Sequence, residues 1–130
     1  MKSKIADHKA ARGPDWETRE APLDIAEALA DIGPDQAALV DCATLWLTNQ
    51  VLGEQDVEKE ISIFLAALAA SEAPVVVVSN ETGLGIVPEN ALARRFRVLQ
   101  GRLNQALAAE ADTVVTVIAG LPLALKGDLP

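Results

Sequence analysis

The only histidine of the chain, His8, lies in a segment whose residue types could do chemistry. It stands in the run SKIADHKAARGPDW, a helical pattern in which Lys4, Lys9 and Arg12 are close by in sequence. Imidazole can act as a general base, a metal ligand or a covalent nucleophile. A single histidine near a terminus is also commonly an ordinary surface residue, so this segment alone leaves both interpretations open.

Acidic and amide side chains follow two strongly apolar runs. Asp41 lies near the end of AALVDC (37–42), where many nucleotide-binding α/β proteins place a carboxylate that coordinates magnesium or orders water. The alternative is that Asp41 caps the helix expected from ATLWLTNQ. Asn80 and Glu81 follow four consecutive valines. They could contact a ribose, a metal or a base edge, or they could form an Asx turn with a solvated glutamate.

Other motifs give weaker or negative signals. Gly83 and Gly85 permit a close backbone approach, but GLG is not a phosphate loop, and G-x-x-x-x-G-K-[ST] occurs nowhere in the 130 residues. One predicted helix carries four arginines: Arg94, Arg95, Arg97 and Arg102. Arg95 and Arg102 share a helix face. They could bind phosphates or a partner's carboxylates, or they could pair with local glutamates in solvent.

Alternating strands and helices must position these residues. Continuously apolar runs, typical of buried parallel strands covered on both faces, occur at 37–42, 74–80 and 113–120. Helices are expected over 22–32, 57–70 and 88–110. LPLALK (121–126) could add an edge strand. This order predicts an α/β fold with a parallel sheet. Ligands bind beyond the carboxyl ends of such strands, which selects three segments along one edge: 41–44, 79–81 and 120–122.

Length and composition limit the class of protein to which the chain can belong. At 130 residues, of which 50% are hydrophobic, the chain suits a single domain, 1–130, with one core. A net charge of −8 and a pI near 4.5 argue against binding to nucleic acid or to anionic membranes. The single cysteine, Cys42, excludes an internal disulfide framework and a cysteine-based zinc cluster, and we predict no metal-ligating residues. No secretory signal or membrane-spanning run is present in the sequence, so we expect a cytoplasmic protein.

Three segments together resemble the adenosylcobinamide kinase/adenosylcobinamide-phosphate guanylyltransferase family of cobalamin biosynthesis. They are KIADHKAARGPDWETREAPLDI (4–25), LVDCATLWLTN (39–49) and VVVVSNETGLGIVPENALARRFRVLQGRLNQALAAEADTVVTVIAGLPLALK (75–126). The resemblance implies a P-loop NTPase-like, RecA-like fold, in which a mostly parallel sheet is flanked by helices. It also implies two reactions: a kinase reaction on the aminopropanol hydroxyl of adenosylcobinamide, and transfer of GMP from GTP to the resulting phosphate through a guanylyl-histidine.

The resemblance also implies roles for individual residues. His8 matches the nucleophile, which attacks the α-phosphorus of GTP and expels pyrophosphate. The residues implied to contact the nucleotide are Lys9, Ala10, Ala11, Arg12, Glu20 and Asp41. Lys9 and Arg12 would offset phosphate charge beside a histidine that must be neutral to attack. The implied partners are GTP, with Mg²⁺, and adenosylcobinamide phosphate.

The chain departs from the family pattern at its N-terminal end. In the family, a kinase-type phosphate loop, a first helix and another strand precede the histidine segment, whereas this chain begins at Met1, just before that segment. We therefore expect an N-terminally truncated sheet, without the backbone cradle and lysine that bind a triphosphate. Because this triphosphate cradle is missing, we expect no kinase activity from this chain.

Three interpretations of this departure stay open. The chain is a piece of a normal enzyme, or a short paralogue whose missing strands come from another chain or are replaced by oligomerisation, or a non-catalytic remnant that acts as a nucleotide-binding or assembly module. A valine-rich strand left at a sheet edge is a template for pairing. Because the family resemblance also implies oligomers, typically trimers, we expect a homo-oligomer.

Overall fold

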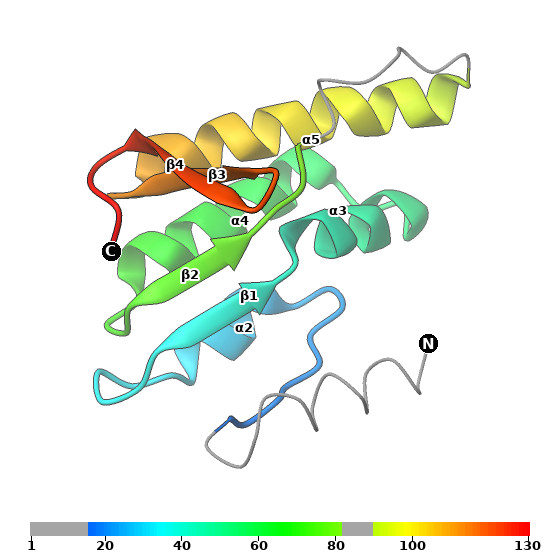
Figure 1. Ribbon diagram of the computed structural model, residues 1–130. Coiled ribbons are helices and arrows are strands. Elements are labelled where there is room, and N and C mark those ends of the chain that lie inside the picture. Colours follow the sequence, from blue (N-terminus) through cyan, green and yellow to red (C-terminus); the bar gives the residue numbers. More distant parts are fainter. Residues whose placement is uncertain (1–15, 82–89) are drawn as a thin grey trace.

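The computed structural model describes residues 16–81 and 90–130, which form four helices and four strands (Figure 1). In chain order these elements are α2 (Ile25–Ala30), β1 (Ala38–Asp41), α3 (Ala43–Leu52), α4 (Val57–Ala70), β2 (Val75–Val78), α5 (Ala91–Glu110), β3 (Val114–Ile118) and β4 (Leu121–Lys126). The mixture of helices and strands, with a small parallel sheet, confirms the predicted α/β class. The helix predicted over 57–70 matches α4, while α2 is shorter than the predicted 22–32.

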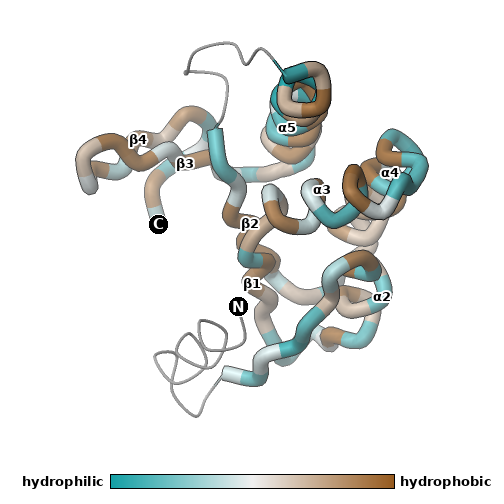
Figure 2. Tube along the Cα trace, turned by 90° about the vertical axis from the view of Figure 1, so that its right-hand side faces the viewer, coloured by the Kyte–Doolittle hydropathy of each residue, from teal (hydrophilic) through white to brown (hydrophobic). Residues whose placement is uncertain are grey.

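Strands β1 and β2 form a parallel pair in which the first residues pair with each other and the last residues pair with each other. Ala38 pairs with Val75 at the start and Asp41 with Val78 at the end. Helices α2 to α5 lie on one side of this pair (Figure 2). Burial alternates along both strands, because successive side chains of a strand point to opposite faces. We predicted strands covered on both faces, but on the outer face the described residues Leu39 and Val76 are 40% and 62% exposed.

The third predicted strand is not part of the parallel sheet, so that prediction is wrong for the described residues. β3 pairs antiparallel with β4, and these two strands form a separate sheet (Figure 1). Ala119 and Gly120 join them with φ values of 52° and 76°, and positive φ at both positions is what a two-residue type I′ turn requires. A continuously apolar run does not distinguish a parallel strand from one arm of a hairpin. The strand expected at 121–126 is confirmed as β4.

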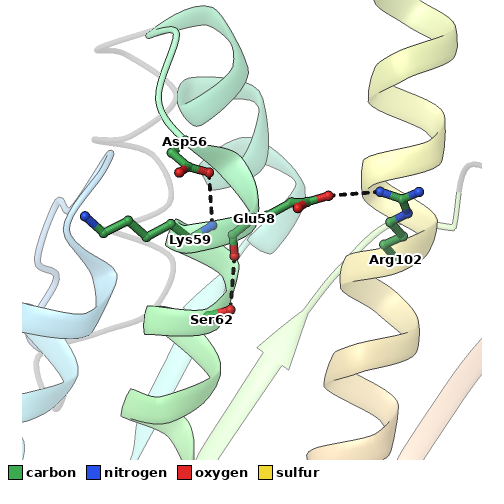
Figure 3. Close-up of polar contacts among 5 residues, drawn as sticks. All are labelled: Asp56, Glu58, Lys59, Ser62 and Arg102. Atoms are coloured by element: carbon green, nitrogen blue, oxygen red, sulfur yellow. Dashed lines mark hydrogen bonds and ion pairs between the residues drawn. The ribbon is translucent and has the colours of Figure 1, made fainter.

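Side-chain caps define where the two longest helices begin. Asp56 precedes α4, and its Oδ1 accepts a hydrogen bond from the backbone N–H of Lys59 at 3.3 Å (Figure 3). Asn90 precedes α5, and its Oδ1 accepts from the N–H groups of Leu92 (2.8 Å) and Ala93 (3.2 Å). Such caps satisfy N–H groups that lack a partner within the helix, so they fix the helix starts.

The core lies between the helices and the inner face of β1 and β2. Trp46 of α3 meets Phe64 of α4 edge to face, with ring centroids 5.0 Å apart, and both side chains are buried. Helix α4 buries Val57, Ile61 and Phe64 against this core. On α5, Leu99 and Leu103 are buried, but Leu92 is 51% exposed. Full burial of a side chain of this size stabilises a fold by roughly 1.5–3 kcal/mol.

Candidate functional site

The predicted site residues divide between described and undescribed parts of the chain. His8, Lys9, Ala10, Ala11 and Arg12 lie outside the described residues, as do Gly83 and Gly85. Glu20 and Asp41 are described, and both are exposed.

Asp41 ends β1, next to the last residue of β2, as expected for a strand-end carboxylate. Its pairing with Val78 brings it beside the segment that begins at Ser79. The alternative that Asp41 caps α3 is wrong, because the N-cap residue is Cys42, whose Sγ accepts a hydrogen bond from the N–H of Leu45 at 3.4 Å. Within the described part of the chain, the carboxylate of Asp41 has no hydrogen-bond or ion-pair partner. It is thus an exposed acid with no structural contact that explains it.

A continuous set of hydrogen bonds ties the end of β2 to α3 and α5. The N–H of Asn80 donates to Thr44 Oγ1 at 2.9 Å, and its carbonyl oxygen accepts from Asn104 Nδ2 at 2.9 Å. Asn104 Oδ1 accepts from Ser79 Oγ at 2.6 Å and from Gln100 Nε2 at 3.0 Å. Gln100 Nε2 also donates to Ser79 Oγ at 3.0 Å. We call these five residues the strand-end network.

Sequence reasoning found only part of this network. It selected the segments containing Thr44, Ser79 and Asn80, but it missed Gln100 and Asn104. These two lie four residues apart on α5, and each directly follows a buried leucine of the apolar stripe. Residues at that spacing share a helix face. Two amide side chains four residues apart, each next to a buried leucine of α5, are the sequence signal that could have identified this pair.

Helix α3 also fixes the segment that carries Glu20. Three of its side chains donate to the backbone carbonyl oxygens of Pro22 and Leu23 at 3.0–3.1 Å. The donors are Trp46, Asn49 and Gln50. The helix that begins beside Asp41 therefore also anchors the chain two residues after Glu20. No hydrogen bond in the described residues joins the two acids directly.

The loop predicted as the third part of the site, 120–122, does not join the strand ends through sheet pairing. Gly120 belongs to the turn between β3 and β4, and Pro122 lies within β4, opposite Val117. In the described residues, β3 is hydrogen-bonded to β4 alone. We predicted that three strand ends form one edge of the site. In the described residues, this edge contains only two of them, the ends of β1 and β2.

The arginine pair on α5 lines a different feature. A cleft of about 430 Å³ separates the start of α4 from the middle of α5, with Arg95 and Arg102 on one wall and Glu58 on the other. Arg102 Nη1 lies 3.2 Å from Glu58 Oε1, and both side chains are mostly exposed (Figure 3). The shared face of the arginines is confirmed. For Arg102 the structure favours pairing with a glutamate in solvent.

The described residues contain neither a cluster of metal ligands nor a membrane-spanning helix. Across 16–81 and 90–130, no three histidine, cysteine, aspartate or glutamate side chains are grouped so as to hold a metal ion. None of the helices in this same part of the chain has the length and apolar character needed to cross a membrane.

Comparison with known proteins identifies the family. Residues 1–125 match the family described as cobinamide kinase / cobinamide phosphate guanyltransferase. The bifunctional adenosylcobalamin biosynthesis protein CobP of Pseudomonas aeruginosa is 41% identical over 131 aligned positions, and the alignment covers 98% of this chain and 76% of CobP. The corresponding CobU proteins of Salmonella typhimurium and Escherichia coli are 41% and 37% identical, each over 97% of this chain and 78% of CobU. The chain therefore belongs to the cobinamide kinase/cobinamide phosphate guanyltransferase family.

Proposed function

We propose that this chain transfers GMP from GTP to adenosylcobinamide phosphate, with His8 as the covalent GMP acceptor. The observation that carries the proposal is the family match over residues 1–125, which includes the histidine segment and both acidic positions. The exposed carboxylate of Asp41 at the carboxyl end of a parallel strand supports it. Ligands of open α/β sheets bind at this edge.

The reaction has two balanced steps. In the first, a neutral ring nitrogen of His8 attacks the α-phosphorus of GTP, so that a P–N bond forms and the P–O bond to pyrophosphate breaks. In the second, a phosphate oxygen of adenosylcobinamide phosphate attacks the same phosphorus and the P–N bond breaks. The product carries GMP through a new P–O–P linkage, and the histidine is free again.

The remaining predicted residues have supporting roles. Lys9 and Arg12 are proposed to offset negative charge on the phosphates, and Ala10 and Ala11 are proposed nucleotide contacts of the same segment. Glu20 and Asp41 are proposed nucleotide contacts, since both are exposed and α3 anchors the chain near each of them.

Magnesium fits this arrangement only as an ion that is bound together with the triphosphate. Mg²⁺ is commonly bound through one or two carboxylates together with substrate phosphates and water, rather than by a cage of protein ligands. In the described residues, Asp41 is a suitable single carboxylate, and no group of three ligands competes with it. The ion would neutralise phosphate charge there.

We assign the phosphorylation step to no residue of this chain. The 130 residues contain no G-x-x-x-x-G-K-[ST] segment, the loop whose backbone N–H groups and lysine cradle a triphosphate.

We also propose a homo-oligomer. Apolar side chains of both sheets support this, because Val76, Val117 and Leu121 are 62%, 64% and 70% exposed.

Incubation with GTP labelled at the α-phosphate tests the proposal. Wild-type protein with Mg²⁺ should acquire acid-labile label, and His8→Ala should acquire none. GTP labelled at the γ-phosphate is the matched control, since that label should leave with pyrophosphate. Absence of label from wild-type protein at high GTP would contradict the transferase assignment. If GTP also left the melting temperature unchanged, a non-catalytic interaction module would be the better description.

A further inference from the structure

The two backbone polar groups of Asn80 are held by two different helices, while its side chain makes no hydrogen bond within the described residues. Its N–H is fixed by Thr44 on α3 and its carbonyl oxygen by Asn104 on α5, each at 2.9 Å. The residue is exposed, and within the described residues its side-chain amide makes no hydrogen bond. A clamped backbone with an unengaged polar side chain, two residues beyond the partner of Asp41, has the character of a ligand contact.

From this arrangement we infer that Asn80 contacts the nucleotide through its side-chain amide, and that Asn104 is a positioning residue that sets its geometry. The inference rests on the proposed guanylyl transfer and adds two residues to it. An amide presents both a donor and an acceptor, so it can pair with a nucleobase edge, a ribose hydroxyl or a phosphate oxygen.

Asn104 is suited to this role because both ends of its amide are engaged. Nδ2 donates to the carbonyl of Asn80, and Oδ1 accepts from Ser79 Oγ and Gln100 Nε2. These contacts leave the Asn104 side chain one orientation, with the donor toward the strand end. The amide thus fixes the segment that follows β2 relative to α5.

Stability alone does not explain the strand-end network. Gln100 is fully buried, yet its Oε1 has no hydrogen-bond partner in the described part of the chain. An unsatisfied buried acceptor costs about 1–3 kcal/mol, which offsets most of what two neutral hydrogen bonds contribute. An apolar side chain beside Leu99 and Leu103 would avoid that cost. What the network does provide is a fixed backbone geometry at Asn80.

Fixed geometry matters for the transfer because reacting groups must be closely aligned. A misplacement of about 1 Å can reduce a rate by about 100-fold. Loss of either backbone hydrogen bond of Asn80 should therefore slow guanylylation much more than it lowers stability. Since the effect of Asn104 passes through Asn80, the two substitutions should not have independent effects.

Four variants test this: Asn104→Ala, Thr44→Val, Asn80→Ala and the double variant Asn80→Ala/Asn104→Ala. The matched control is Gln105→Ala, which removes an exposed amide from the same helix. The measurements are kcat and KM for labelling by α-labelled GTP, the Kd for GTP, and the melting temperature. Asn104→Ala and Thr44→Val should each lower kcat/KM by about 10-fold or more, with melting temperatures within a few degrees of Gln105→Ala. In the Asn80→Ala background, Asn104→Ala should have almost no further effect.

Several results would overturn the inference. One is labelling of Asn104→Ala at the rate of Gln105→Ala. Another is an equal loss from Asn104→Ala with and without the Asn80 side chain, which indicates a purely structural role. Should Asn104→Ala fail to fold, Thr44→Val tests the same inference, because it removes the hydrogen bond to the backbone N–H of Asn80. Wild-type protein that neither labels nor binds GTP overturns the proposed function as well, whereas labelled wild type with unaffected variants overturns this inference alone.

Discussion

Asp41 and Asp56 form a matched pair for testing what the strand-end carboxylate does. Both are exposed aspartates that come just before a helix, Asp41 before α3 and Asp56 before α4. The carboxylate of Asp56 caps its helix by accepting from Lys59, whereas α3 is capped by the sulfur of Cys42. The same truncation to alanine should therefore have opposite consequences at the two positions.

The structure gives the expected magnitudes. Asp56→Ala removes a helix cap and should lower the free energy of unfolding by about 1 kcal/mol, while GMP transfer stays unchanged. Asp41→Ala removes no contact in the described residues and should change the free energy of unfolding by less than about 0.5 kcal/mol. A charge-assisted contact to the nucleotide is worth about 1.5–3 kcal/mol, so its loss should lower kcat/KM for GTP by about 10- to 100-fold.

Urea denaturation followed by circular dichroism measures the first quantity, and labelling with α-labelled GTP measures the second. A nucleotide contact at Asp41 would be refuted if Asp41→Ala lost as much stability as Asp56→Ala and kept its transfer rate. That result would mean that Asp41 has a structural role at the start of α3. A loss of transfer in both variants would instead indicate that the assay reports stability.

Two further predictions concern backbone geometry and the arginine helix. Gly127→Ala should lower the free energy of unfolding by at least about 1–2 kcal/mol, because φ is +69° and an added Cβ would lie 2.6 Å from the carbonyl oxygen of Asp112. Gly101→Ala should raise it by about 0.5–1 kcal/mol, since the site lies inside α5 and the new Cβ would meet no atom within 4 Å other than its chain neighbours and the backbone of α5 itself; equal effects in denaturation would contradict this. Arg102→Ala should change stability by less than about 1 kcal/mol and leave transfer unchanged, because its partner Glu58 is exposed; a fall in GTP labelling would assign Arg102 to phosphate binding instead.

The sequence was sufficient to predict the features that depend on periodicity. The apolar spacing over 57–70 predicted α4 correctly, and the apolar runs at 37–42 and 74–80 predicted the two parallel strands β1 and β2. It was also sufficient to predict which polar residues follow those strands. These features are local, since a helix stripe and a strand end are both visible within a short window.

The features that were missed depend either on local backbone conformation and an unusual helix cap or on contacts between distant segments. The run 113–120 is apolar enough for a parallel strand, but Ala119 and Gly120 turn it into a hairpin, and alanine is not a typical residue for a positive φ. Cys42 as the cap of α3 was not predicted, because sulfur is a weaker acceptor than the oxygens that usually cap helices. The Asn104 contacts cross from α5 to the end of β2, so no local pattern encodes them.

The most direct test of the central claim is a pulse-chase of the protein-bound label. Wild-type protein is first labelled with α-labelled GTP and freed of excess nucleotide, and adenosylcobinamide phosphate is then added. The label should leave the protein and appear in the cobinamide product in equal amount, and His8→Ala should neither acquire nor transfer label. Label that stays on the protein, or that is bound to His8→Ala as strongly as to wild type, would contradict transfer through a guanylyl-histidine.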